Sequence, residues 1–518
     1  MRIERTKNAS RNIAAGMILK IFNIFMPFVM RTAMIYFMGM QYVGLNSLFT
    51  SILQVLNLVE LGVGSAMVYS MYKPISEDDT VTICALMKLY KIYYRVIGAV
   101  IAVVGLAITP FIPNLIEGDV PSNMNVYILY LINLAATVLS YWLFAYKNCL
   151  FQAHQRVDVT SKIMLVTYTI HYILQFVSIA FLKNYYAYVL AMLFTHALTN
   201  IVTAVIADKI YPDYKPSGEL DKEMTKGINQ RVKDLFTSKL GTVIINSADT
   251  IVISAFLGLT ALAVYQNYYF ILTAVIGLIT IIFNACTAGI GNSIITETKE
   301  KNFNDLNKFT FIISWISGLC TCCFLNLYQP FMKIWVKKDD LMLEFSAVIC
   351  FCIYYFVYEI NQLLNTYKDA GGIWHEDRFR PLVTALSNLV MNLIMVNIWG
   401  LYGVLLSTVF STLLVGMPWL FHNLFSTLFL KEQLVPYLKN LAFYVVMVLI
   451  ASVLSFASCY FINFGKWSTL ILRAVVCVIV PNIFFLLVYR KRKEFKESVI
   501  IADKMTKGKL RLTKLIKK

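Results

Sequence analysis

Long apolar runs recur along the chain and are separated by short polar segments. A helix needs about 20 mostly apolar residues to cross the hydrocarbon core of a bilayer, and this criterion predicts about fourteen membrane-spanning helices. In the first half of the chain the predicted spans cover residues 12–37, 43–70, 90–112, 126–150, 160–182 and 186–208. In the second half they cover residues 238–257, 262–292, 307–328, 341–366, 381–399, 402–424, 437–462 and 468–489. We therefore expect an all-α integral membrane protein.

The two halves of the chain align with each other when the sequence is shifted by 219 residues. The shift places residues 36–39 over 255–258 and Lys20 over Lys239, and it brings Arg31 next to Asp249. Because six predicted spans separate the copies, both copies have the same orientation, as in transporters built from parallel repeats. We predict two six-helix bundles related by a pseudo-twofold axis and followed by two further helices. The predicted divisions are a bundle over 1–208, a cytoplasmic linker over 209–237, a second bundle over 238–424, two additional helices over 425–489 and a basic tail over 490–518.

Composition and charge support this interpretation. Of the 518 residues, 58% are hydrophobic and only 14% are charged, which excludes a set of water-soluble domains. The net charge is +17, and the basic residues gather in alternate loops and in the tail after Tyr489. By the positive-inside rule both termini are cytoplasmic, in a multi-pass protein of the plasma membrane. The tail contains a single aromatic residue, Phe495, so we expect it to contact the lipid bilayer and not a nucleic acid.

Charged residues at membrane depth are costly and therefore mark candidate functional positions. Lys20, Asn23 and Arg31 share one face of the first predicted helix and form a cationic stripe. From the repeat we expect Arg31 and Asp249 to lie at similar depth and to pair as a gate. Lys20 and Lys239 would lie near the cytoplasmic mouth, where two ammonium groups could hold a diphosphate. Snorkelling of these lysines to the interface is an equally good explanation.

Three acids are candidates for gating or for binding a coupling ion, namely Glu60, Asp249 and Glu359. Proton coupling and sodium coupling both stay open, and we expect no other cofactor. Further polar residues with helical spacing are expected to line the lumen, although hydrogen bonds between helices explain such residues as well. This group comprises Asn23, Asn57, Asn246, Tyr269, Asn284 and Gln362.

No combination of residues typical of catalysis or of a metal site is visible in the sequence. The closest cysteine cluster, Cys320, Cys322 and Cys323, lacks the paired spacing and the histidines of a zinc site. A phosphate-binding glycine loop followed by Lys-Ser or Lys-Thr is also absent from the sequence, so we expect no ATP hydrolysis by this chain and no enzyme activity.

Six short motifs, in this order and spacing, resemble the polysaccharide-transport family, the O-antigen-type flippases of the multidrug/oligosaccharidyl-lipid/polysaccharide exporter superfamily. They lie at residues 31–39, 42–45, 60–66, 247–258, 388–392 and 399–404, so the resemblance covers nearly the whole chain. It implies two six-helix bundles that work by alternating access. It also implies a substrate in which an oligosaccharide is linked through diphosphate to a polyprenyl lipid. The family moves this substrate from the inner to the outer leaflet of the bacterial plasma membrane for export of O-antigen, capsule or exopolysaccharide, and polysaccharide assembly enzymes are further expected partners.

Two alternatives remain open. An ion-coupled multidrug or other small-molecule exporter of the same superfamily would favour carboxylates on the first helix, and residues 12–37 contain none. A membrane polysaccharide polymerase or glycosyltransferase commonly has a large outward loop or an acidic pair after the first helix. Residues 38–42 form a short connection without an acid. Both observations favour the flippase.

Overall fold

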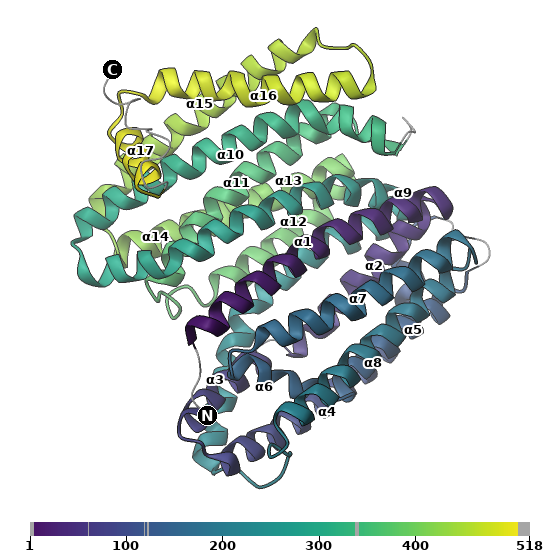
Figure 1. Ribbon diagram of the computed structural model, residues 1–518. Helices are drawn as coiled ribbons and strands as arrows, with labels where there is room; N and C mark the ends of the chain where they lie inside the picture. Colours follow the sequence, from purple (N-terminus) through teal and green to yellow (C-terminus); the bar gives the residue numbers. More distant parts are fainter. Residues whose placement is uncertain (1–4, 61, 119, 122–123, 337–340, 506–518) are drawn as a thin grey trace. The chain divides into compact units, whose positions relative to one another are not determined.

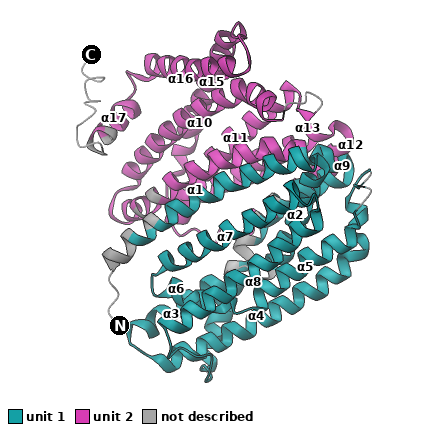
Figure 2. Ribbon diagram, turned by 45° about the vertical axis from the view of Figure 1, so that its right-hand side comes forward, with its two compact units in different colours: residues 1–263 teal, residues 264–518 magenta. Residues whose placement is uncertain are grey.

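The computed structural model describes residues 5–60, 62–118, 120–121, 124–336 and 341–505; most of these residues are helical, and none of them is in a strand. The chain divides into two compact units, residues 1–263 and 264–518, shown in different colours in Figure 2. The division falls inside a long helix, α9, so residues 238–257 belong to unit 1. The prediction of an all-α membrane protein is confirmed.

Unit 1 is built from the helices up to the first part of α9 (Figure 1). Helix α7 lies between α1 and α8, and α5 lies between α4 and α8. The elements are α1 (Arg5–Phe37), α2 (Met40–Leu56), η1 (Asn57–Glu60), α3 (Val63–Ser76), α4 (Thr80–Ile108), η2 (Thr109–Leu115), α5 (Val126–Trp142), η3 (Ala145–Lys147), α6 (Asn148–Ala153), α7 (Val157–Ala180), α8 (Tyr185–Ile210) and α9 (Lys222–Thr296).

Unit 2 contains the rest of α9 and the helices that follow it. Helix α10 is central, since it packs against α11, α15, α16 and α17. The elements are α10 (Lys299–Trp335), α11 (Phe345–Ala370), α12 (Arg380–Trp399), α13 (Leu401–Ser411), η5 (Thr412–Gly416), α14 (Met417–Thr427), η6 (Lys431–Gln433), α15 (Leu434–Tyr460), α16 (Lys466–Tyr489) and α17 (Lys493–Met505). Helix α17 lies within the predicted basic tail, and Phe495 anchors it in an aromatic core with Phe311 and Tyr489.

Among the described residues, 11 helices are long and apolar enough to cross a membrane, or 12 if the bent pair Val126–Trp142 and Ala145–Ala153 is one span. Two features explain the difference from the fourteen predicted spans. Helix α9 contains two predicted spans, joined at Gly258, where the backbone is not helical. Helix α2 has only 17 residues, because the predicted span over 43–70 is broken at η1 before it continues as α3. Each predicted span thus overlaps a helix or a broken helix.

Two glycines at corresponding positions of the proposed repeat have similar backbone conformations. Gly39 follows α1 with φ 110° and ψ 171°, and Gly258, 219 residues later, has φ 85° and ψ 171°. Residues with a Cβ atom rarely adopt positive φ, so glycine is favoured at both sharp turns. The two turns agree with the register of the repeat.

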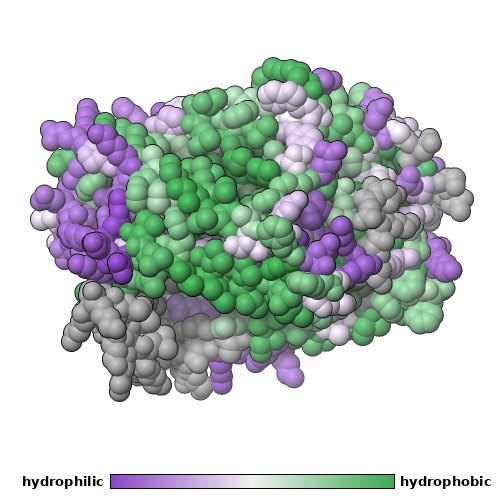
Figure 3. Space-filling view, turned by 90° about the horizontal axis from the view of Figure 1, so that it is seen from above, coloured by the Kyte–Doolittle hydropathy of each residue, from purple (hydrophilic) through white to green (hydrophobic). Residues whose placement is uncertain are grey.

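The surface of the protein includes a wide apolar area. Figure 3 shows hydrophobic residues across the middle of one face, with hydrophilic residues gathered toward its two ends. Helices α15 and α16 carry side chains such as Val453, 67% exposed, and Leu487, 60% exposed. A soluble protein rarely exposes so many large apolar side chains together, whereas a bilayer covers them.

Candidate substrate and ion sites

The cationic stripe predicted on the first helix lies on α1. Lys20 and Asn23 are exposed, whereas Arg31, about three turns after Lys20, is half-buried. Arg31 lies near enough to Tyr188 of α8 for an electrostatic interaction. The ring of Tyr188 stacks on that of Tyr185, with centroids 5.5 Å apart. Arg31 is therefore a guanidinium placed beside a group of tyrosines inside unit 1.

Asp249 is buried in the part of α9 that belongs to unit 1. The segment after η2 is tied to this part of α9. Ser254 Oγ donates to the Leu115 carbonyl oxygen over 2.7 Å, and the Glu117 N–H donates to the Ser254 carbonyl oxygen over 2.9 Å. The Arg31–Asp249 gate stays a prediction. The side chains of two further predicted lumen residues, Lys239 and Asn246, lie outside the described part of the chain.

Glu60 lies where the second predicted span is broken. The 3₁₀ turn η1 ends at Glu60, and Gly62 has φ 91°, so the helix stops and restarts as α3. A break of this kind frees backbone polar groups, and within a membrane it is tolerated where protein or a polar cavity surrounds it. The break therefore places the Glu60 carboxylate among groups that hydrogen-bond to it.

Two tyrosines from different helices hold this carboxylate. Tyr94 of α4 donates to Glu60 Oε1 over 2.8 Å, and Tyr141 of α5 donates to Oε2 over 3.0 Å. Tyr90 donates in turn to the Tyr94 hydroxyl over 2.5 Å, and Asn57 Oδ1 is 3.2 Å from the Tyr141 hydroxyl. An acid that is half-buried and anchored at both oxygens can exchange a proton or bind a cation without leaving its place.

The sequence argument found Glu60 and Asn57 but missed the three tyrosines. Tyr90 and Tyr94 are four residues apart and so share a face of α4. That spacing could have indicated them. Tyr141 is on a separate helix, and only the packing of α4 against α5 brings it to the same carboxylate.

In unit 2 the predicted acid Glu359 lies on α11 with 1% of its surface exposed. Its Oε1 atom accepts no hydrogen bond from the described residues. The other predicted lumen residues differ in environment: Tyr269 and Gln362 are half-buried, and Asn284 is exposed. The ring of Tyr269 stacks on that of Tyr265 at 5.4 Å. Glu359 is thus a second acid inside the membrane region, with spare capacity to bind a proton or cation.

The asparagines of the motif at residues 388–392 have a structural role. Asn388 Nδ2 donates to Thr408 Oγ1 over 2.9 Å, and Ser407 donates to Asn392 Oδ1. These bonds join α12 to α13, and both asparagines are fully buried. They hold two helices together in a region without water, as polar residues in membrane proteins often do.

A buried ionic cluster precedes α12 in unit 2, and it was not predicted from the sequence. Arg380 donates to Asp377 from Nε over 2.6 Å and from a terminal nitrogen over 2.8 Å. Asn423 of α14 donates to the same carboxylate over 2.9 Å, and Lys368 of α11 lies 3.7 Å from it. Asp377 therefore joins three helices.

The many long apolar helices define a polytopic membrane protein, and its broken helix and buried carboxylates are the features that a substrate or ion could use. The sequence model of a family described as "Polysaccharide biosynthesis protein" matches residues 9–288, which is more than half of the chain. The chain belongs to this family. No curated protein sequence matches it.

Solved structures of transporters share the fold. One described as "Lipid II flippase MurJ, inward closed conformation" matches with a TM-score of 0.64 and 15% identity, over 92% of this chain and 99% of that one. An inward-facing multidrug resistance MATE family transporter of the MOP superfamily matches with a TM-score of 0.60 and 13% identity, over 82% of this chain and 99% of that one. At such identities the likeness shows the fold, and it agrees with the superfamily that the motifs indicated.

Proposed function

We propose that the protein is a flippase that moves a polyprenyl-diphosphate-linked oligosaccharide from the inner to the outer leaflet of the bacterial plasma membrane. It would do so by alternating access, for export of O-antigen, capsule or exopolysaccharide, with both termini in the cytoplasm. The observation that carries this proposal is the charge of α1. Residues 15–37 contain Lys20 and Arg31 and no carboxylate, and Arg31 is half-buried beside tyrosines. A cation at membrane depth suits a diphosphate.

The family supports this function, because its description concerns polysaccharide biosynthesis. The fold it shares with a lipid II flippase is compatible with a lipid-linked substrate, and polysaccharide assembly enzymes would be the partners that supply it. The multidrug exporters with the same fold keep the efflux alternative open, and Glu60 and Glu359 are the acids that such a protein could use. A polymerase or glycosyltransferase is disfavoured, because the connection after the first helix, residues 38–42, is short and contains no acid.

Complementation of a flippase-deficient bacterium tests the proposal, with surface polysaccharide measured at matched membrane levels of each variant. We expect wild type to restore the polymer and Arg31→Ala to lose most of that activity. Loss of one charge-assisted contact costs about 1.5–3 kcal/mol, or roughly 10- to 100-fold. Arg31→Lys keeps the charge and should retain part of the activity. The control is Arg95→Ala, which removes an exposed arginine of α4.

The outcomes separate the alternatives. If wild type fails to restore the polymer but raises resistance to cationic drugs, the protein is an exporter and the flippase proposal is wrong. If all variants restore the polymer equally, the flippase stands and Arg31 has no role in binding.

The proposed coupling site is tested with Glu60→Gln. The amide keeps the size of the side chain but neither binds a proton nor carries a charge, so proton-coupled or sodium-coupled transport should fall at least about tenfold. Tyr141→Phe removes one hydrogen bond and leaves the acid, and we expect a smaller loss. Equal transport by Glu60→Gln and wild type under an imposed ion gradient would contradict a coupling role for this carboxylate.

A further inference from the structure

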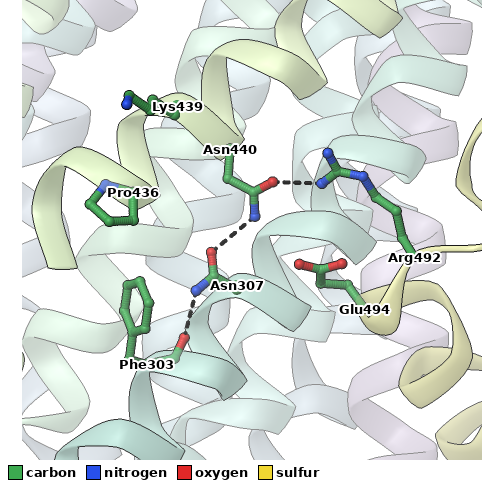
Figure 4. A pocket seen from close by; sticks show the side chains of 7 residues that line it. All are labelled: Phe303, Asn307, Pro436, Lys439, Asn440, Arg492 and Glu494. Atoms are coloured by element: carbon green, nitrogen blue, oxygen red, sulfur yellow. Dashed lines mark hydrogen bonds between the residues drawn. The ribbon is translucent and has the colours of Figure 1, made fainter.

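A cavity of about 450 Å³ lies in unit 2, and none of the acids described above lines it. Figure 4 shows the side chains around it. Helix α10 contributes Asn307, α15 contributes Lys439 and Asn440, and the junction of α16 with α17 contributes Arg492 and Glu494. The basic tail begins at this junction, so the cavity lies on the membrane face that is predicted to be cytoplasmic.

Arg492 is held in position by its surroundings. One terminal nitrogen donates to Asn440 Oδ1 over 2.6 Å, and the guanidinium carbon lies 4.0 Å from the ring centroid of Phe443. Asn440 donates to Asn307 Oδ1 over 3.1 Å, which fixes its amide in turn. A guanidinium has five N–H donors, and the bond to Asn440 uses one of them. The group is therefore ordered in advance and retains capacity to bind an anion.

The segment that carries Arg492 is itself anchored. Phe495 is buried, and its ring stacks on Trp315 of α10 with centroids 5.9 Å apart. Val499, one turn later, is also buried. Burial of the two side chains holds α17 against unit 2, so Arg492 has a defined place although it lies at the start of a basic tail.

The charge of the cavity favours an anion. Two cations, Lys439 and Arg492, face one carboxylate, Glu494. Lys491 and Lys493 are exposed next to them and add to the positive potential. Basic pockets between membrane helices on the cytoplasmic side are suited to phosphate head groups of lipids.

The surroundings indicate that the anion carries acyl chains. On α15, Leu438 is 39% exposed beside Lys439, and Val446, two turns later, is 48% exposed. Leu487 of α16 is 60% exposed, just before the basic junction. The two helices that lead to the cationic cavity thus expose apolar side chains. A free phosphate ion would use only the cavity, whereas a phospholipid would use both.

We propose that this cavity binds the phosphate head group of an anionic membrane phospholipid, whose acyl chains lie along α15 and α16. The site is independent of the proposed transport function, since its charged residues belong to the additional helices and the tail. Bound lipid would fasten the end of α16 and the start of α17 to the membrane face.

The test measures lipid binding to the purified full chain in detergent by native mass spectrometry, with phosphatidylglycerol and with phosphatidylcholine. We expect preferential binding of phosphatidylglycerol, weakened about tenfold or more in the double variant Lys439→Gln/Arg492→Gln. The matched control, Lys491→Gln/Lys493→Gln, removes the same charge outside the cavity and should change the affinity less than about threefold. Equal loss in both double variants would mean general attraction to the tail and would overturn the site.

Two further arms complete the test. Competition by millimolar glycerol 3-phosphate or inorganic phosphate distinguishes a lipid head group from a free anion. Full displacement of the lipid would show a site for a free anion and would overturn the proposal.

If the double variant does not elute as a single folded species, Lys439→Gln alone replaces it, because Lys439 is exposed. Unchanged binding of phosphatidylglycerol to a folded Lys439→Gln protein would then contradict the proposal.

Discussion

Replacing Asp377 by asparagine should destabilise unit 2 strongly. The side chain is 2% exposed and accepts two hydrogen bonds from Arg380 and one from Asn423. Arg380 and Lys368 are themselves buried, with 5% and 9% of their surfaces exposed. The asparagine has almost the same shape, but it carries no charge. One of the two carboxylate oxygens becomes an NH2 group, which cannot accept a hydrogen bond, and the remaining amide oxygen is a weaker acceptor. Buried Arg380 then lacks the carboxylate that it binds, whereas Lys368 keeps Asp369 at 2.7 Å.

The size of the effect follows from the cost of an uncompensated charge. Removal of one partner of a buried ion pair typically costs about 3–5 kcal/mol, whereas an exposed pair contributes about 0–1 kcal/mol. We expect Asp377→Asn to fall in the first range, because the carboxylate and Arg380 are both buried. Arg380→Lys should cost less, because lysine keeps the positive charge, although it loses the bidentate hydrogen bonds to Asp377.

The assay is denaturant unfolding of the purified protein in detergent, with free energies taken from the midpoint and slope. Glu376→Gln is the matched control, because it removes the same charge from the neighbouring, exposed residue. A change below about 0.5 kcal/mol in the control is expected for an exposed site. If Asp377→Asn were no more destabilising than Glu376→Gln, the reasoning from burial would be refuted.

Two further predictions concern unit 1. A methyl group at Gly44 would lie 2.1 Å from the Leu259 carbonyl oxygen, so Gly44→Ala should cost about 1–3 kcal/mol in the same assay, while Gly16→Ala, with no atom within 4 Å, should be neutral. Equal stability of the two variants would contradict this close approach. Burial lowers the pKa of His154, so the folded protein favours the neutral ring and loses stability as the pH falls below the ordinary value of 6.5. His154→Gln should reduce the loss of stability between about pH 7 and 5, measured by thermal unfolding. The control is His375→Gln, at an exposed position, which should leave this loss of stability unchanged.

The membrane helices could be predicted from the sequence because the bilayer imposes their length and apolarity. Their breaks were harder to predict. The span over 43–70 reads as one apolar segment, but the structure divides it at η1, and the only local signal is Gly62 two residues after Glu60. The spans over 238–257 and 262–292 were separated by their length in the sequence, and the structure has a non-helical residue, Gly258, between them.

The candidate sites were predicted in part. Glu60 and Glu359 could be singled out because a charge within an apolar segment is rare. Their surroundings could not be predicted, since Tyr94 and Tyr141 reach Glu60 from other helices. The same reason applies to Asp377. It lies in a polar segment of the sequence, and only the approach of Asn423 and Lys368 in the structure shows that it is buried.

The sequence by itself determined that this protein spans the membrane many times and belongs to a polysaccharide biosynthesis family, because hydropathy and ordered motifs are properties of the chain. The tertiary structure alone decided which polar groups are used for packing and which keep free binding capacity. Asn388 and Asn392 are satisfied between two helices, whereas Glu359 retains an acceptor without a hydrogen bond from the described residues. Hydrogen-bond partners come from segments far apart in the sequence, and helical spacing on one segment does not determine which segments meet.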